Sequence, residues 1–368
     1  MSREKKQDLK TGYTTGTCAA AAAKAAIWAL VEKKPVDEVS VSLPIGKTAV
    51  LRVSQTAILP ECAVSDIIKD GGDDPDVTHG AVIRAEVSWM GAGDIDQDAI
   101  KIFGGTGVGK VTRPGLPVAV GEAAINPTPR KMIEHEIRET LKAKNIRRAV
   151  KVIISVPDGE KIALQTMNAR LGILGGISIL GTRGIVIPFS TAAYRSTLAV
   201  SIKASAENHL DHLVLTTGGR SEKYGMAMYP NLDPMAFHEA GEFIGFALKK
   251  CVSYGIKKAT IAGMMGKFSK VAAGELMLHS SKSSVDFDFL ASLAKEAGAD
   301  ADTVEQIQSA NTASQAGDIM KEKGMMRFFD LVTTRCWEVC SKKTAGQVNL
   351  EVILYTINGE LLSRKEFI

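Results

Sequence analysis

Residues 212–225 read HLVLTTGGRSEKYG, an apolar run that ends in two threonines and two glycines. A short apolar run that stops at a glycine pair and continues into a polar segment is typical of a strand that turns into a helix. The sequence then predicts a helix from Met235 to Tyr254 and a strand in KKATIAGMM, residues 257–265. Strand, glycine turn, helix and strand in this order indicate a parallel crossover unit, so we expect an α/β domain here.

The remainder of the second half predicts one more strand, a long helical region and a terminal hairpin. LAVSIKAS at 198–205 has the apolar pattern of a strand, and residues 287–342 have a helical pattern. VNLEVILYTI, Asn358-Gly359 and ELLSR then give a strong hairpin signal. We place the domain boundary after residue 195, and the terminal hairpin could pack on either domain.

The first half predicts an α+β arrangement. A small-residue helix at about 18–31 is followed by VSVSL and TAVLRVSQTAIL, which predict a hairpin that turns at Ile45-Gly46. A second helix starts near Pro129, and AVKVIISV and KIALQTM predict a strand pair that turns at Asp158-Gly159. We therefore expect two domains: an N-terminal α+β sandwich over 1–195, and a Rossmann-like three-layer α/β domain over 196–368.

Composition excludes several classes of protein. The 368 residues carry 45 basic and 41 acidic side chains, a net charge of +4 that is too small to indicate a nucleic-acid partner. The polar start MSREKKQDLK fits neither a signal peptide nor a membrane span, so we expect a cytoplasmic protein without a membrane partner. Five cysteines without a CxxC pair argue against a disulfide framework and a thiolate metal cage.

The segment GGTGVGKV at 104–111 nearly spells a phosphate-binding loop. Gly104, Gly109 and Lys110 have the GxxxxGK spacing, but Val111 replaces the hydroxyl residue that would bind magnesium, and prolines in VTRPGLP block the required helix. Three interpretations stay open at this point: a nucleotide triphosphate site, a conformationally demanding loop near an active site, or a turn that links two strands.

Three other segments have both a ligand-binding and a structural interpretation. Threonines 14, 15 and 17 precede an alanine-rich helix, where hydroxyls and free amides suit a carboxylate but also simply cap the helix. The turn from Thr216 to Arg220 follows a strand, where open α/β sheets bind ligands, and Glu222 could pair with a ribose hydroxyl or a sulfonium-bearing ligand. Lys267 could hold a carboxylate, although lysines are more often solvated, and His279 could carry a proton, although a lone histidine is more often structural.

Five segments, in order along the chain, resemble the cobalt-precorrin-5B C1-methyltransferase family of the anaerobic corrin pathway. They are LKTGYTTGTCAAAAAKAA from Leu9, GGTGVGKVTRPGLPVAVGEAAINPTPRKMI from Gly104, LGILGGISILGTRGIVIPFS from Leu171, LTTGGRSEKYG from Leu215 and GMMGKFSKVAAGELMLHS from Gly263. The resemblance spans Leu9 to Ser280 and is much more specific than any one motif.

The resemblance implies methyl transfer from S-adenosyl-L-methionine to C-1 of cobalt-precorrin-5B, giving cobalt-precorrin-6A on the route to adenosylcobalamin. The expected cofactor-binding residues are Thr216, Thr217, Gly218, Gly219 and Glu222. Because the corrinoid carries many carboxylates, arginines and lysines in or beside the resembling loops are expected to bind it. The expected substrate-binding residues are Thr15, Thr17, Gly105, Gly107, Lys110, Arg113, Arg130, Arg183, Arg195, Lys267 and His279.

No catalytic side chain is assigned, because a methyl displacement can be catalysed largely by positioning, which contributes roughly 7–11 kcal/mol at best. The cobalt belongs to the small-molecule substrate, so no metal site on the protein is expected. Protein partners could include neighbouring enzymes of the pathway. Two alternative functions are a phosphate-using small-molecule enzyme built on GGTGVGK and a non-catalytic corrinoid carrier.

Overall fold

The computed structural model describes residues 9–91, 96–278 and 283–366. The chain forms two compact units, residues 1–190 and 191–368, each with its own hydrophobic core. The division falls where helix α4 (Thr191–Glu207) begins, whereas the sequence-based boundary at residue 195 lies inside that helix. Both units combine helices with sheets, so the protein is a mixed α/β protein. Among the described residues, no helix is both long and apolar enough to cross a membrane.

The first unit is built on a five-stranded mixed sheet with the strand order β4-β5-β6-β10-β7. All neighbours are antiparallel except β10 and β7, which run parallel. The elements of this unit are β1 (Gly12–Tyr13), α1 (Thr15–Glu32), β2 (Glu38–Ser42), β3 (Thr48–Arg52), β4 (Gln55–Ile58), β5 (Cys62–Ile68), β6 (Val82–Trp89), β7 (Ile100–Gly104), β8 (Gly107–Val108), β9 (Lys110–Val111), α2 (Pro127–Ala143), β10 (Val150–Ser155), α3 (Gly159–Ala163), β11 (Ile173–Leu174), β12 (Gly176–Ile177) and β13 (Ile185–Val186).

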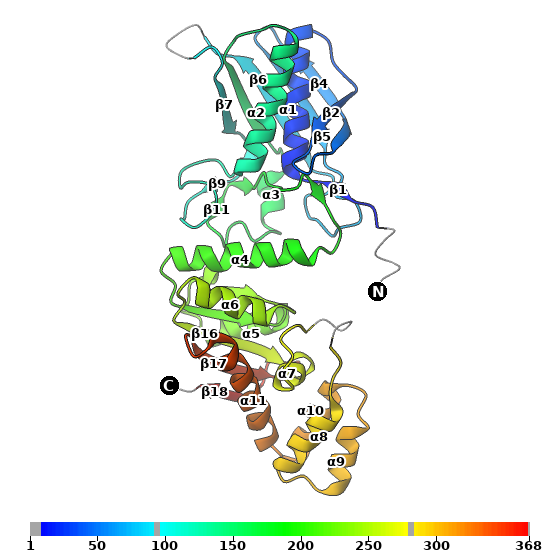
Figure 1. Cartoon of the computed structure of the whole chain (residues 1–368), viewed down its shortest axis with the longest axis vertical. Coiled ribbons are helices and arrows are strands. Elements are labelled where there is room, and N and C mark those ends of the chain that lie inside the picture. The colour runs from blue at the N-terminus through cyan, green and yellow to red at the C-terminus, as the bar shows by residue number, and fades with distance from the viewer. Residues whose placement is uncertain (1–8, 92–95, 279–282, 367–368) are drawn as a thin grey trace. The chain divides into compact units, whose positions relative to one another are not determined.

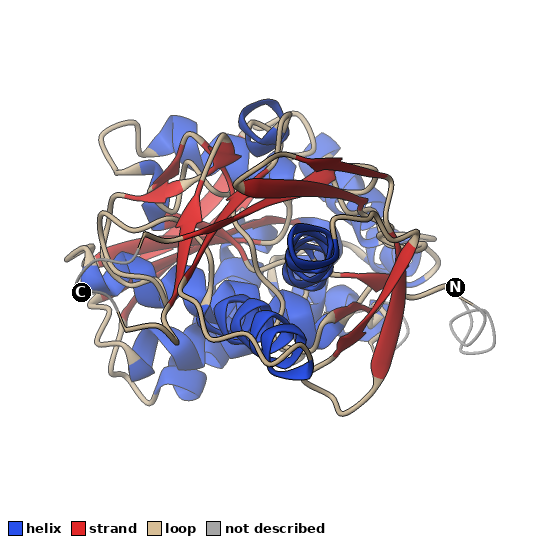
Figure 2. Ribbon diagram, turned by 90° about the horizontal axis from the view of Figure 1, so that it is seen from above, coloured by secondary structure: helices blue, strands red, loops and turns tan. Residues whose placement is uncertain are grey.

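Helix α1 is the centre of this unit because its small side chains permit close packing on every side. Its residues from Cys18 to Ala23 are completely buried, and it packs against α2, β5, β6 and β2. The hairpin of β2 and β3 confirms the predicted turn at Ile45-Gly46, where Gly46 has a φ of 75°. Helices α1 and α2 lie side by side in Figure 1, and Figure 2, which looks along them, shows strands around them.

The predicted strand pair around Asp158-Gly159 is wrong in its second half. AVKVIISV forms β10, but helix α3 begins at Gly159 instead of a returning strand. The reason is a close crossing of backbones: a Cβ atom at Gly159 would lie 2.0 Å from the carbonyl oxygen of Gly107. A Cβ at Gly176 would lie 2.1 Å from the same oxygen. Glycine is therefore required here for close approach and does not mark a hairpin turn.

Substitution of Gly107 tests this backbone crossing. Its φ is 70°, and a Cβ added to it would lie 1.9 Å from the carbonyl oxygen of Val156. Gly107→Ala should therefore lower the free energy of unfolding by more than about 3 kcal/mol, through backbone strain and the displaced carbonyl. Urea unfolding measures this loss. Gly121→Ala is the control, because Gly121 also has a positive φ of 93° but has open space around it, and it should cost only about 1 kcal/mol. Equal losses in the two variants would contradict the backbone crossing.

The second unit is built on a five-stranded sheet with the order β15-β14-β16-β17-β18. The first four strands run parallel, and β18 is antiparallel to β17. The elements that follow α4 are β14 (His212–Thr216), α5 (Gly219–Met228), η2 (Pro234–Ala236), β15 (Phe237–Glu239), α6 (Ile244–Ser253), β16 (Lys258–Met264), α7 (Met265–Ala272), α8 (Phe287–Glu296), α9 (Ala301–Gln308), α10 (Ala313–Glu322), α11 (Arg327–Thr344), β17 (Asn349–Tyr355) and β18 (Leu361–Glu366).

Helices cover both faces of this sheet. Tyr229, just after α5, donates a hydrogen bond to Glu351 on one face, while Thr333 of α11 bonds Ser363 on the other. Ser363 and Arg364 are adjacent on β18 and point to opposite faces, and Arg364 pairs with Glu351. The terminal hairpin thus belongs to the second unit, where its strands complete the sheet.

Two predictions of local structure in this unit are wrong. LAVSIKAS is part of helix α4, where the buried positions are Leu198, Ser201, Ile202, Ala204 and Ser205. This spacing of three and four residues is helical, and the apolar alternation that suggested a strand was accidental. The start of the predicted 235–254 helix is instead η2 and strand β15. The three residues of β15 are too few to give a periodic signal, and their pairing with β14 determines their conformation.

Glu351 joins the strands at the amino-terminal end of this sheet through a buried polar network. Its side chain is fully buried and accepts hydrogen bonds from Thr260 at 2.5 Å, from Arg364 at 2.6 Å and from Tyr229. Burial alone would raise the pKa of this carboxyl, but the hydrogen bonds from Thr260, Tyr229 and Arg364 outweigh it, so the pKa is lowered. The network therefore stabilises the ionised form and ties α5, β16, β17 and β18 together.

Glu351→Gln should lower the free energy of unfolding by about 2 kcal/mol at pH 7, because Arg364 loses its buried partner. Since the pKa of Glu351 is lower in the folded than in the unfolded chain, wild-type stability should fall as the pH drops from 5 toward the folded pKa. The variant should lose less stability over this range. Urea titrations at pH 7 and pH 4 measure both effects. Glu366→Gln removes an exposed partner of Lys258 and should cost less than about 1 kcal/mol. Equal costs in the two variants would contradict the role of Glu351.

Candidate functional site

The strand order of the second unit creates a switch point between β14 and β16. The chain leaves β14 through α5 to reach β15 on one side, then passes through α6 to reach β16 on the other side. The connections after β14 and β16 therefore diverge, and a crevice opens beyond the carboxyl ends of these two strands. Ligands of open α/β sheets bind in this position.

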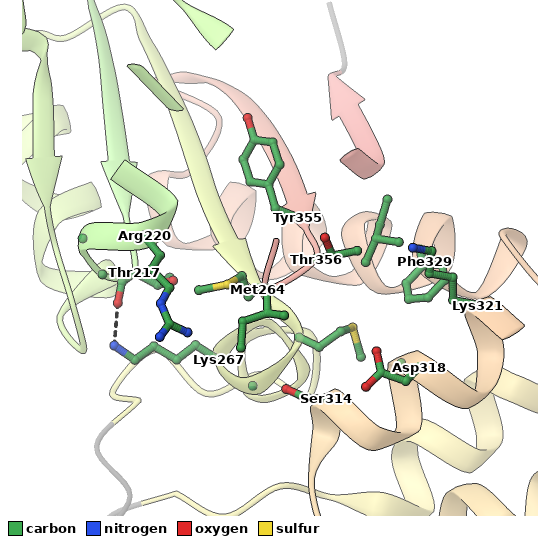
Figure 3. Close-up of a pocket in the computed structure, with 17 residues that line it drawn as sticks. Thr217, Arg220, Met264, Lys267, Ser314, Asp318, Lys321, Phe329, Tyr355 and Thr356 are labelled. Carbon is green, nitrogen blue, oxygen red and sulfur yellow. Dashed lines mark hydrogen bonds between the residues drawn. The ribbon is translucent and has the colours of Figure 1, made fainter. Parts of the chain in front are cut away.

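A cavity of about 450 Å³ occupies this crevice, a volume within the usual range for small-molecule sites. Residues at or just after the carboxyl ends of the three parallel strands β14, β16 and β17 line the cavity. Helices α10 and α11 close its far side, as Figure 3 shows. The lining residues are Thr217, Gly218, Gly219, Arg220, Met264, Met265, Gly266, Lys267, Ser314, Gly317, Asp318, Lys321, Phe329, Tyr355, Thr356, Ile357 and Leu362.

One side of the cavity carries two basic side chains. The Lys267 ammonium donates a hydrogen bond to the carbonyl oxygen of Thr217 at 2.5 Å, and the exposed Arg220 lies beside it (Figure 3). Helices α5 and α7 both begin here, with Gly218 and Met264 at their N-cap positions, and neither cap residue supplies a side-chain hydrogen bond. Uncapped amide groups and the positive ends of two helix dipoles, together with a lysine, suit a carboxylate or a phosphate.

Lys267 is half-buried, and its surroundings change its proton affinity. Burial lowers the pKa of its ammonium group, although the nearby carboxylates Glu242 and Glu239 act in the opposite direction. Lys270 adds a further lowering contribution. An anion in the cavity would oppose the effect of burial and favour the charged form of Lys267.

The opposite side of the cavity is formed by α10 and is acidic and apolar. Ser314 and Asp318 extend into it from one face of the helix, and the Phe329 ring from α11 lies close by (Figure 3). Met264 lies between this side and the basic side in Figure 3, and Met265 also lines the cavity. The cavity can therefore hold a ligand with an anionic end, an apolar middle and hydrogen-bonding groups at its other end.

The predicted cofactor-binding residues are partly gathered at this cavity. Thr217, Gly218 and Gly219 line it. Thr216 is fully buried in β14, and its hydroxyl donates to the carbonyl oxygen of His238 at 3.4 Å. Glu222 lies one turn further along α5 and is outside the lining. Lys267, expected as a substrate residue, lines the same cavity as the glycine turn.

No sequence pattern predicted the residues of the far wall of the cavity. Ser314, Asp318 and Phe329 come from the long helical region between β16 and β17, where no motif marks a binding residue. Thr356 and Ile357 line the cavity because they follow β17, which pairs parallel with β16. The sequence pattern predicted only the hairpin of β17 with the next strand and did not indicate the pairing with β16.

The segment 104–111 is not a nucleotide triphosphate loop in this structure. Its residues form the ends of β7 and the short strands β8 and β9, and the next helix, α2, begins only at Pro127. Gly107 lies in the backbone crossing, and a Cβ at Gly105 would lie 2.2 Å from the Ser155 hydroxyl. These glycines permit close packing, while the Lys110 side chain is exposed on β9.

The predicted threonines hold a loop in place. Thr15 accepts a hydrogen bond from the Leu180 amide at 2.9 Å, and Thr17 donates to the Gly184 carbonyl oxygen at 2.7 Å. Both side chains are buried, so they fix the 178–184 loop, which carries the exposed Arg183. The structure thus brings Thr15, Thr17 and the Arg183 loop together within the first unit.

The other predicted cationic residues are distributed over both units. Arg130 donates to the carbonyl oxygens of Ile125 and Ile102, at 3.0 and 3.1 Å, and so has a structural role. Arg113 is half-buried beside Gly172. Arg195 belongs to α4 of the second unit, where its guanidinium lies 4.7 Å from the ring centre of Phe246. His279 lies outside the described residues.

Comparisons with known proteins agree on one family. The CbiD family model matches residues 2–188, and the model of the CbiD C-terminal domain matches residues 277–366. A cobalt-precorrin-5B C(1)-methyltransferase from Geobacillus sp. (strain WCH70) is 52% identical over 98% of each chain. The protein of that name from Priestia megaterium is 51% identical over 97% of this chain and 96% of its own length.

A crystal structure of the cobalamin biosynthesis protein (cbiD) from Archaeoglobus fulgidus is also similar, with 27% identity over 86% of this chain and 85% of that one and a TM-score of 0.40. The two family models together reach both units, and the curated relatives match nearly the whole length. This chain belongs to the CbiD family.

Proposed function

We propose that this chain is a cobalt-precorrin-5B C(1)-methyltransferase, which transfers a methyl group to C-1 of the macrocycle and gives cobalt-precorrin-6A in anaerobic adenosylcobalamin synthesis. The observation that carries the proposal is the identity of about half of all residues, over nearly the full length, with relatives of that name. The cavity at the switch point of the second unit supports it, because a methyltransferase needs a site for a smaller donor in addition to one for its macrocyclic substrate.

We propose S-adenosyl-L-methionine as the methyl donor and the switch-point cavity as its site. In this proposal the second unit acts as a Rossmann-like three-layer domain that receives an adenosyl ligand at the carboxyl ends of its strands. The donor carboxylate binds at the amino ends of α5 and α7 beside Lys267, and the glycine turn Gly218-Gly219 lets the backbone approach it. The apolar middle of the cavity, with Met264 and Met265, accommodates the methylene groups beside the donor sulfur.

The reaction itself needs alignment more than a protein nucleophile. C-1 of the corrinoid forms a bond to the methyl carbon while the bond from that carbon to sulfur breaks, and the electron pair passes to sulfur. The sulfonium becomes the neutral thioether of S-adenosylhomocysteine. Holding the two reacting atoms in line is the contribution we assign to the protein.

Exposed cationic residues of the first unit are proposed to bind the carboxylates of the corrinoid. Lys110 and Arg183 have exposed side chains on β9 and on the loop fixed by Thr15 and Thr17. Arg113 is proposed in the same role from its position after β9. The glycines at 105 and 107 are proposed to support this surface by packing.

Catalysis can be separated from carriage by a single-turnover assay. The protein incubated with cobalt-precorrin-5B and methyl-labelled S-adenosylmethionine should transfer the label to the macrocycle, detected by chromatography and mass spectrometry. Unlabelled corrinoid recovered in tight complex with the protein would indicate a carrier and contradict the proposal. Magnesium-dependent hydrolysis or transfer of ATP phosphate by the protein would favour a phosphate-using enzyme instead.

The donor site can be tested with Gly218→Val. Gly218 has an extended backbone, with φ and ψ both 167°, and an added Cβ would meet no atom within 4 Å. The valine should therefore fold normally and occupy space at the cavity wall, so the dissociation constant for S-adenosylhomocysteine should rise at least tenfold, about 1.4 kcal/mol. Isothermal titration calorimetry measures it, and circular dichroism checks the fold.

The matched control for this test is Gly91→Val in the first unit, where an added Cβ also has open space. It should bind S-adenosylhomocysteine as the wild type does. A Gly218→Val protein that is folded and binds with unchanged affinity would remove the donor from the switch-point cavity.

A further inference from the structure

Asp318 is a carboxylate at the cavity that has no partner of its own. It extends from α10 into the cavity, on the side away from Lys267 and Arg220 (Figure 3). Within the part of the chain that the structure describes, it makes no hydrogen bond and no ion pair. Lys321, one turn further along the same helix, is paired with Glu360 of the β17–β18 turn and does not neutralise it. Two acceptor oxygens of one carboxylate are thus available to a ligand.

Ser314 adds a second hydrogen-bonding group to the same face of α10. It precedes Asp318 by four residues, so the two side chains lie one helical turn apart, and both line the cavity. A carboxylate beside a hydroxyl on one rigid helix suits a ligand with two adjacent hydroxyl groups. A sulfonium would be attracted to the carboxylate by charge alone and would make no use of the Ser314 hydroxyl.

Gly317 brings α10 close enough for this contact. A Cβ atom at Gly317 would lie 2.9 Å from Cγ of Met265, at the start of α7. The glycine therefore lets α10 pack against the helix whose amino end forms the basic side of the cavity. Asp318, the next residue on the helix, is therefore placed at the cavity wall.

We propose that Asp318 of α10 binds the ribose 2′ and 3′ hydroxyls of the adenosyl donor and thereby fixes the direction in which the donor lies. This inference rests on the proposed function, which places an adenosyl ligand in the cavity. With the carboxylate at the basic side and the ribose at α10, the amino-acid and nucleoside halves of the donor contact different walls. Asp318 is a binding and orienting residue, and it comes from the long helical crossover between β16 and β17.

The two walls can be tested separately with two ligands. S-Adenosylhomocysteine contains both halves of the donor, whereas 5′-methylthioadenosine contains the nucleoside without the amino acid. Asp318→Asn should weaken both ligands about tenfold by calorimetry, because it removes the charge that strengthens the ribose hydrogen bonds. Lys267→Met should weaken S-adenosylhomocysteine and leave 5′-methylthioadenosine unchanged. Glu322→Gln, at the end of the same helix and outside the cavity lining, is the matched control and should bind both ligands normally.

A third ligand identifies the hydroxyls directly. The 2′,3′-dideoxy form of 5′-methylthioadenosine should bind wild type and Asp318→Asn with the same affinity, since the groups that Asp318 contacts are missing. Equal weakening of the dideoxy and the parent ligand by Asp318→Asn would overturn the ribose contact. Asp318→Asn that weakens S-adenosylmethionine but not S-adenosylhomocysteine would also overturn it, because this difference reports a contact to the sulfonium.

Binding by the wild type and by Asp318→Asn separates the donor site from the role of Asp318. A wild-type protein that binds neither S-adenosylhomocysteine nor 5′-methylthioadenosine would overturn the donor site and with it this inference. A wild type that binds both, with Asp318→Asn binding both equally well, would overturn the role of Asp318 alone. Because Asp318 is exposed and unpaired among the described residues, the variant should unfold at the wild-type temperature.

Discussion

The parallel pairing of β14 with β16, and the opposite directions in which the chain leaves them, is the constraint on which the site depends. Parallel strands end at the same edge of a sheet, so every connection after a strand starts at that edge. Where the connections after β14 and β16 diverge, a crevice is left between them beyond the ends of the strands. The amino ends of α5 and α7, Lys267 and the glycine turn meet there because the topology brings them to the same edge.

The two ends of the same strands have opposite properties. At their amino-terminal end, Glu351 is completely buried and bonded to three neighbours, which fixes β16, β17 and β18 relative to one another. At their carboxyl end, Thr217 and Met264 lead into uncapped helix starts and an open cavity. The polar network at one end holds the strands in register, so their pairing does not depend on the groups that line the cavity at the other end.

Local sequence predicted the parts of the site that follow directly from a strand. The run of apolar residues before Gly218 and Gly219 and the second run before Lys267 each indicated a strand that ends at a turn, and both turns line the cavity. Strand β15 was not predicted because its three residues are too few to show the alternation of a strand, and it is a strand because it pairs with β14. Asp318 escaped because its position depends on the packing of Gly317 against Met265, a contact between residues far apart in the chain.

The glycine-rich segment of the first unit shows why the same glycine pattern can indicate two different structures. A loop that holds a phosphate and a backbone that crosses another backbone both need glycine, because both require an approach closer than a Cβ permits. What separates them is the next element: a helix would point its amides at an anion, whereas β8 and β9 pair with β12 and β11. Gly107 therefore builds a rigid support, and any recognition of a polyanionic ligand by this part of the unit falls to exposed side chains such as Lys110 and Arg183.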